Sequence, residues 1–172
     1  MSNLKSKQIV KEVNRIKYLL KFDINSIDIF QESYGKGIIV SLNDLLQYKD
    51  DAIVAFLTSC IRHEDEPDKV LGNAVFEETD LLDLIFACTD DLIKIIIDSL
   101  PKKKREYEIE EPSEFVDVDY LYYLWKTTFN GNDKEFWNST LRKINKMLDI
   151  YKEAHETPEQ KKKKENMLPI MD

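Results

Sequence analysis

Glycine and proline are scarce in this chain, and their scarcity restricts how often the backbone can reverse direction. The 172 residues include four glycines and five prolines, far below the roughly 12% that the two types contribute to an average protein. β-Sandwiches and β-barrels place such residues at each of their many turns. The composition therefore disfavours a turn-rich β architecture and predicts a mainly α fold.

The remaining composition predicts a folded, acidic protein of the cytosol. Hydrophobic residues make up 42% of the chain, enough to build a core and to exclude a fully disordered chain. The net charge of −8 disfavours nucleic-acid binding, because neutralising phosphates requires Lys and Arg. No apolar run approaches the roughly 18 residues of a membrane-spanning helix, and charged residues from Lys11 to Lys17 interrupt what would be the apolar stretch of a signal peptide. We therefore expect no membrane partner.

Apolar residues between positions 25 and 100 recur with the period of amphipathic helices. One helix is expected to begin at a cap on Asn25 or Ser26 and to stop at Gly35 and Gly37. A capping-box pattern that starts at Ser41 predicts a second helix. The clearest apolar stripe, which predicts a third helix, consists of Ile53, Phe56, Leu57, Cys60 and Ile61.

Two more helices are expected before residue 101. The first begins at a cap on Thr79 or Asp80. The second begins at the Thr and Asp residues 89–91, where acids suit the positive end of a helix dipole, and it ends at Pro101. The conformation of residues 1–22 stays open, because residues 16–22 fit a strand as well as a helix.

A change in composition after residue 100 divides the chain. Residues 1–100 form a small helical N-terminal domain, and residues 101–115 form a charged linker of a basic block followed by glutamates. We expect residues 116–156 to form a short helical C-terminal module rich in aromatic side chains, and residues 157–172 to form a mobile charged tail.

The aromatic module is the candidate binding region. One helix is expected to end at Asn130-Gly131, a short turn follows, and a last helix begins at a cap on Ser139 or Thr140. These short helices carry more aromatic side chains than they can bury, so part of the set is expected to contact a partner. The candidate partner-binding residues are Tyr120, Tyr123, Trp125, Phe136 and Trp137.

Residue patterns typical of enzymes are missing from the sequence. The segment Tyr34-Gly35-Lys36-Gly37 lacks the spacing of a phosphate-binding loop. The residues after His63 read as an exposed acidic loop rather than as metal ligands. Cys60 and Cys88 lie in apolar helical stretches, which is typical of protonated core thiols rather than of nucleophiles or a disulfide. We therefore expect no catalytic residue, no metal, no cofactor and no enzymatic activity.

The aromatic module resembles the distal part of the tail assembly chaperones of long-tailed bacteriophages. The resemblance rests on Asp119-Tyr120-Leu121-Tyr122-Tyr123-Leu124-Trp125-Lys126 and on Glu135-Phe136-Trp137-Asn138-Ser139-Thr140, which matches the family's turn before a closing helix. The family often has Pro after this Thr, and this chain has Leu141. Pro is favourable at the first helical position, yet Thr140 caps the helix without it.

The resemblance implies a two-part chaperone of the infected host's cytoplasm that is absent from the mature virion. The helical domain would cover the tape measure protein, and the distal module would recruit the major tail tube protein. The resemblance leaves open whether the chain self-associates and whether it arises by frameshift. The alternatives are a small helical virion subunit such as a head–tail connector, and a host-directed inhibitor protein; a metabolic enzyme comes last.

Overall fold

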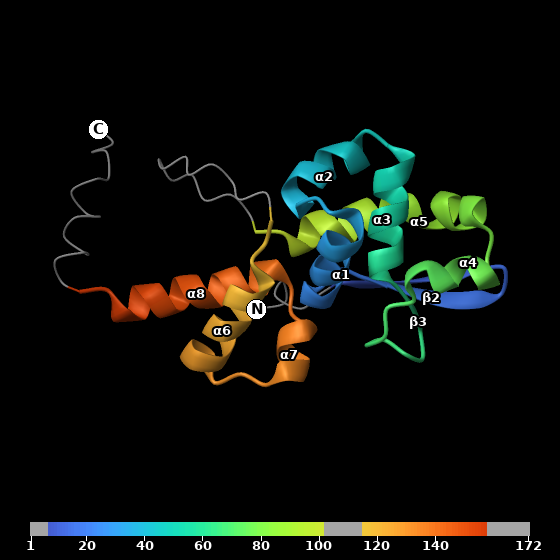
Figure 1. Ribbon diagram of the computed structural model, residues 1–172. Coiled ribbons are helices and arrows are strands. Elements are labelled where there is room, and N and C mark those ends of the chain that lie inside the picture. Colours follow the sequence, from blue (N-terminus) through green and yellow to red (C-terminus); the bar gives the residue numbers. More distant parts are fainter. Residues whose placement is uncertain (1–6, 102–114, 158–172) are drawn as a thin grey trace, which may run out of the picture.

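We analysed a computed structural model of the chain, which describes residues 7–101 and 115–157 (Figure 1). The described residues form eight α-helices, one 3₁₀-helix and three strands. In chain order the elements are β1 (Gln8–Val13), β2 (Ile16–Lys21), α1 (Ile24–Tyr34), α2 (Ile38–Leu46), α3 (Asp50–Cys60), β3 (Ile61–His63), the 3₁₀-helix Gly72–Ala74, α4 (Val75–Glu78), α5 (Leu81–Ser99), α6 (Val118–Phe129), α7 (Asp133–Trp137) and α8 (Leu141–His155).

A three-stranded antiparallel sheet with the order β1-β2-β3 shows that the mainly α prediction was wrong. The strands β1 and β2 form a hairpin that pairs Val13 with Ile16. Its two turn residues, Asn14 and Arg15, both have positive φ angles, as a two-residue hairpin turn requires. The scarcity of glycine was therefore a poor guide here, because the turn uses Asn and Arg instead.

The third strand has only three residues and lies far in sequence from β2, the strand with which it pairs. A local sequence pattern therefore does not predict it. It follows α3 directly, and its Arg62 pairs with Leu19 of β2. Ile61, which the sequence placed on the apolar stripe of the third helix, therefore opens a strand. Its three residues are extended because β2 supplies their hydrogen-bonding partners.

The helices of the N-terminal half occupy the predicted regions but differ in where they begin. Asp23, rather than Asn25 or Ser26, caps α1 by accepting a hydrogen bond from the Ser26 backbone N–H. Gly35 ends this helix in the left-handed conformation, as predicted. Ser41 lies buried inside α2 and does not cap it.

Residues 81–99 form one helix where the sequence predicted two. Thr89, the predicted cap of the second helix, instead donates a hydrogen bond from its hydroxyl to the Ile85 carbonyl, 2.7 Å away. This satisfies the hydroxyl within the helix and leaves the backbone uninterrupted. Asp80 caps the helix by accepting from the Leu82 backbone N–H, which confirms one of the two caps predicted there.

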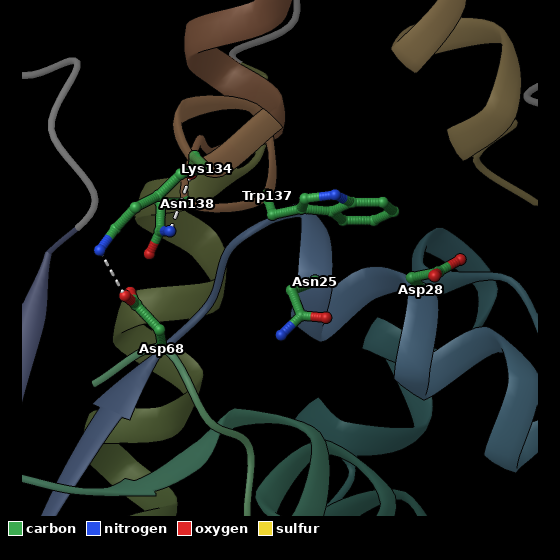
Figure 2. A pocket seen from close by; sticks show the side chains of 6 residues that line it. All are labelled: Asn25, Asp28, Asp68, Lys134, Trp137 and Asn138. Carbon is green, nitrogen blue, oxygen red and sulfur yellow. Dashed lines mark hydrogen bonds and ion pairs between the residues drawn. The ribbon is translucent and has the colours of Figure 1, made fainter. Parts of the chain in front are cut away.

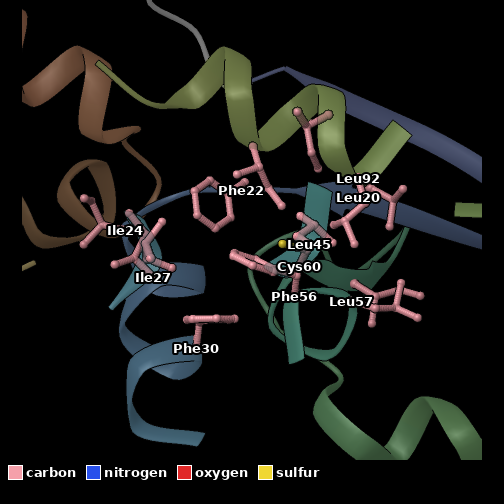
Figure 3. Close-up of a cluster of buried hydrophobic side chains, with 14 of the residues drawn as sticks. Leu20, Phe22, Ile24, Ile27, Phe30, Leu45, Phe56, Leu57, Cys60 and Leu92 are labelled. Atoms are coloured by element: carbon pink, nitrogen blue, oxygen red, sulfur yellow. The ribbon is translucent and has the colours of Figure 1, made fainter. Parts of the chain in front are cut away.

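The core lies where α1, α3 and α5 pack against one another and against the sheet. Figure 3 shows Phe22, Ile27, Phe30 and Phe56 meeting in this region. The Phe30 and Phe56 rings stack with their centroids 4.1 Å apart. Both cysteines are fully buried, which confirms their prediction as core residues.

The three helices after residue 115 agree with the pattern read from the sequence. Asn130 ends α6 in the left-handed conformation, Asn132 caps α7, and Thr140 caps α8. In Figure 1 these helices lie together on one side of the N-terminal half, and α8 extends away from it. The predicted linker and tail lie outside the described residues apart from Pro101, Phe115 and Thr157.

Candidate protein-binding surface

Helix α6 sorts the aromatic residues onto two opposite faces. Trp125 lies on the inner face and is buried. Tyr120 and Tyr123 lie one helical turn apart on the outer face, with 56% and 61% of their surfaces exposed. The outer face of α6 therefore presents two large amphipathic rings to solvent, where a partner could contact them.

The connection between α6 and α7 is fitted closely over the buried indole. Trp125 donates a hydrogen bond from Nε1 to the Asn132 carbonyl, 3.0 Å away. Gly131 lies directly against the same ring, and a Cβ at this position would come within 2.0 Å of Nε1. Phe136 of α7, fully buried, packs against Trp125 with 6.0 Å between ring centroids. These contacts hold α7 at a fixed position beside α6.

Trp137 lies partly exposed at the seam between α7 and α1. Its ring stacks on that of Tyr122 with 6.2 Å between centroids. It also lines an open pocket of about 440 Å³. Figure 2 shows the pocket residues from both halves of the chain, namely Asn25, Asp28, Asp68, Lys134, Trp137 and Asn138.

The pocket is polar, and its two carboxylates differ in pKa. Burial raises the pKa of Asp28, with a further contribution from the negative charges of Glu32 and Asp119. A hydrogen bond from Lys134, 2.8 Å away, lowers the pKa of Asp68. The lining residues offer hydrogen-bonding groups and one aromatic face, which suits a polar side chain or a peptide edge.

A buried ionic cluster in the N-terminal half contacts the aromatic module. Asp23 lies between Arg62 and Lys21, whose nearest nitrogens are each 2.9 Å from its carboxylate, and all three side chains are almost fully buried. Lys21 also donates a hydrogen bond to the side chain of Asn138, the residue that follows α7. Ile24 donates from its backbone N–H to the Ser139 carbonyl, 2.9 Å away. The aromatic module is therefore attached to the sheet and to α1 at specific polar points.

Two further links attach the module at its ends. Gln31 of α1 makes two hydrogen bonds to the backbone of Val116, one as donor and one as acceptor. Arg142 of α8 donates to the Leu100 and Ile97 carbonyls at the C-terminal end of α5. That each half folds alone stays a prediction. In the described residues the two halves are joined by the hydrogen bonds given above.

The five candidate residues thus fall into two groups. Trp125 and Phe136 are buried and give the module its shape, whereas Tyr120, Tyr123 and Trp137 reach solvent. The sequence brought these residues together through helical spacing alone. It did not reveal the polar side of the pocket, because Asn25, Asp28 and Asp68 reach it from parts of the chain far from the module.

The described residues hold no group of three or more His, Cys, Asp or Glu side chains placed to bind a metal ion. Among them, no helix combines the length and the apolar character needed to cross a membrane. No family model, no curated protein and no solved structure matches this chain.

Proposed function

We propose that this protein is a tail assembly chaperone that binds a phage tape measure protein and recruits tail tube subunits. The observation that carries the proposal is the exposed aromatic surface of Tyr120, Tyr123 and Trp137, held on a module whose Phe136-Trp137 turn leads into a Thr140-capped helix. Exposed aromatic rings on a rigid support are the usual anchors of protein–protein interfaces.

The attachment of the module supports a recruiting role. Buried residues fix the relative positions of α6 and α7, so the aromatic surface is ordered before a partner arrives. Pre-ordering of this kind lowers the entropy lost on binding. The acidic surface of the N-terminal half adds a second region suited to reversible contacts with a client.

Co-expression with a phage tape measure protein tests the proposal. We expect the client to be recovered in the soluble fraction with this protein and to aggregate without it. Equal insolubility in both cases would contradict the proposal. Recovery of the chain in purified virions would instead favour a structural subunit such as a head–tail connector.

Recruitment of tube subunits is tested with the double variant Tyr120→Ala/Tyr123→Ala. Both side chains are largely exposed, so the thermal unfolding measured by circular dichroism should stay unchanged while binding to the tail tube protein weakens. Tyr48→Ala is the matched control, because Tyr48 is equally exposed but follows α2. Unchanged binding by the double variant would remove the aromatic surface from the proposal.

A further inference from the structure

Helix α5 carries an apolar stripe that the rest of the described chain leaves mostly exposed. Leu82 and Phe86 have 60% and 86% of their surfaces exposed and Ile97 has 47%, whereas Ile93, which lies between them along the helix, is partly buried against the core. At 100° per residue these four side chains fall within an arc of about 60° along the whole helix. An almost fully exposed Phe is unusual, and exposed apolar side chains aligned on one side of a helix mark a binding surface.

The other sides of α5 already have partners. Its buried side, which includes Leu84, Leu92 and Ile96, packs in the core. A second side faces β1, where Asn14 contacts Asp83, Lys11 pairs with Asp91, and Lys7 pairs with Asp98. These contacts follow the length of the helix. The stripe is therefore the remaining side of a helix that is otherwise fixed in place, and Figure 1 shows α5 extending beyond α3 at its N-terminal end.

Acidic residues border the stripe along one edge, where Asp90 and Asp83 follow it at 100° per residue. Residues 77–98 contain seven Asp or Glu residues and a single Lys. Glu77 and Asp90 are exposed and have no ion-pair partner among the described residues. A second copy of this chain would bring one acidic rim against another, which is unfavourable, whereas a basic partner would gain from the same rim.

We propose that the α5 stripe binds a basic amphipathic helix of the client, with apolar residues in one stripe and Lys or Arg beside it. Such a helix would lie along α5 in the manner of a two-helix coiled coil, apolar side against apolar side and its basic residues along the acidic edge of α5. The inference rests on the proposed function for the identity of the client, and it adds the surface and the chemistry of the bound segment.

Peptide binding to the full-length chain tests the surface directly. The probe is a fluorescently labelled helical peptide of about 18 residues with Leu on one face and Lys elsewhere, and its twin carries Glu in place of Lys. We expect the Lys peptide to bind, with an affinity that falls as salt is raised, and the Glu peptide to bind at least about tenfold more weakly.

The variant Leu82→Ser/Phe86→Ser should lose about tenfold or more in affinity for the Lys peptide, because two apolar anchors are removed. Its circular dichroism spectrum should not change, since both side chains are mostly exposed. The matched control is Ile39→Ser/Val40→Ser, which alters two exposed apolar residues on α2 and should bind as the native chain does.

Three outcomes would overturn the inference: equal binding of both peptides, unchanged affinity of the stripe variant, or sedimentation showing that this variant converts a native dimer into a monomer. Co-expression separates it from the proposed function. If the stripe variant still keeps the tape measure protein soluble, the inference fails and the function stands. If the Lys peptide binds at the stripe but the native chain leaves the client insoluble, the proposed function fails.

Discussion

Gly131 illustrates at the scale of a single residue how the backbone shapes the aromatic surface. Its missing side chain lets the α6–α7 connection lie against the Trp125 ring, where a Cβ would come within 2.0 Å of the indole nitrogen. The sequence marked this position as the end of a helix. The close approach of backbone to ring depends on the fold, and no spacing pattern reports it.

Replacing Gly131 with Ala should destabilise the protein by about 1–3 kcal/mol, because the added methyl group must displace the connection or the indole. Urea unfolding followed by tryptophan fluorescence measures the change. Gly72→Asn is the control. Gly72 has a positive φ that Asn tolerates and open space around it, so this variant should change stability little. Equal stability of the native and Gly131→Ala proteins would show that the connection is loose.

The two thiols should be unreactive in the folded protein. Burial raises the pKa of Cys60 to about 12 and that of Cys88 to about 11. Neither thiol should react with a disulfide reagent at pH 8 until denaturant is added. Rapid reaction of one thiol in the native state would place that residue at the surface.

The same shifts predict how stability depends on pH above neutrality. The unfolded chain begins to ionise its thiols near pH 8.5, whereas the native chain keeps them protonated to about pH 11. The contribution of the thiols is therefore constant below about pH 8.5, and it falls as the pH rises because the unfolded state loses protons first. Cys60→Ala/Cys88→Ala should flatten this part of the stability curve.

At the scale of elements, the residue that caps α1 has a second role. Besides capping the helix, it pairs with buried cations. Asp23 caps the helix and also neutralises the buried Arg62 and Lys21. Asp80 caps α5 at the surface and has no ion-pair partner within residues 7–101 and 115–157. Two residues of the same type and the same local role are therefore expected to differ in energy.

Asp23→Ala should lower the free energy of unfolding by about 3–5 kcal/mol, because it leaves two buried cations without a counter-charge. Asp80→Ala, the matched control, should cost about 1 kcal/mol, the usual value of a helix cap. Urea titrations followed by far-UV circular dichroism compare the two. Similar losses in both variants would mean that the buried cluster contributes little beyond capping.

Local patterns located most helices but missed two features of the element order. The Thr and Asp residues at 89–91 have the composition of a helix start, yet core packing of the residues on either side keeps α5 continuous. The sheet was left as an open alternative for residues 16–22 and was not expected at residues 61–63. The pairing of β2 with β3 joins residues about 40 positions apart, and a sequence window cannot include both partners.

At the scale of the whole molecule, the aromatic module is packed on the N-terminal half rather than held apart from it. Lys21, buried in the sheet, contacts Asn138 just after α7, and Arg142 donates hydrogen bonds to the Ile97 and Leu100 carbonyls at the end of α5. The latter contact satisfies a helix end that has no glycine cap of its own.

A fragment of residues 1–100 should still fold, because the sheet, α1, α3 and α5 share a core of their own. It should be less stable than the full chain, since removing the module exposes Lys21 and the Ile24 backbone N–H. Far-UV circular dichroism and thermal unfolding of both proteins test this prediction. Aggregation of the fragment, or loss of its helical signal, would refute the division into two modules.

The sequence by itself determined where most helices lie, that α6 ends at Asn130 and that α8 begins beside Thr140. These features depend on the 3.6-residue period and on side chains that bond their own backbone, so neighbours in sequence suffice to decide them. Tertiary structure alone decided the sheet, the continuity of α5, the buried Asp23 cluster and the exposure of Phe86. Each of these depends on which distant segment supplies, or fails to supply, a partner for a strand edge, a charge or an apolar side chain.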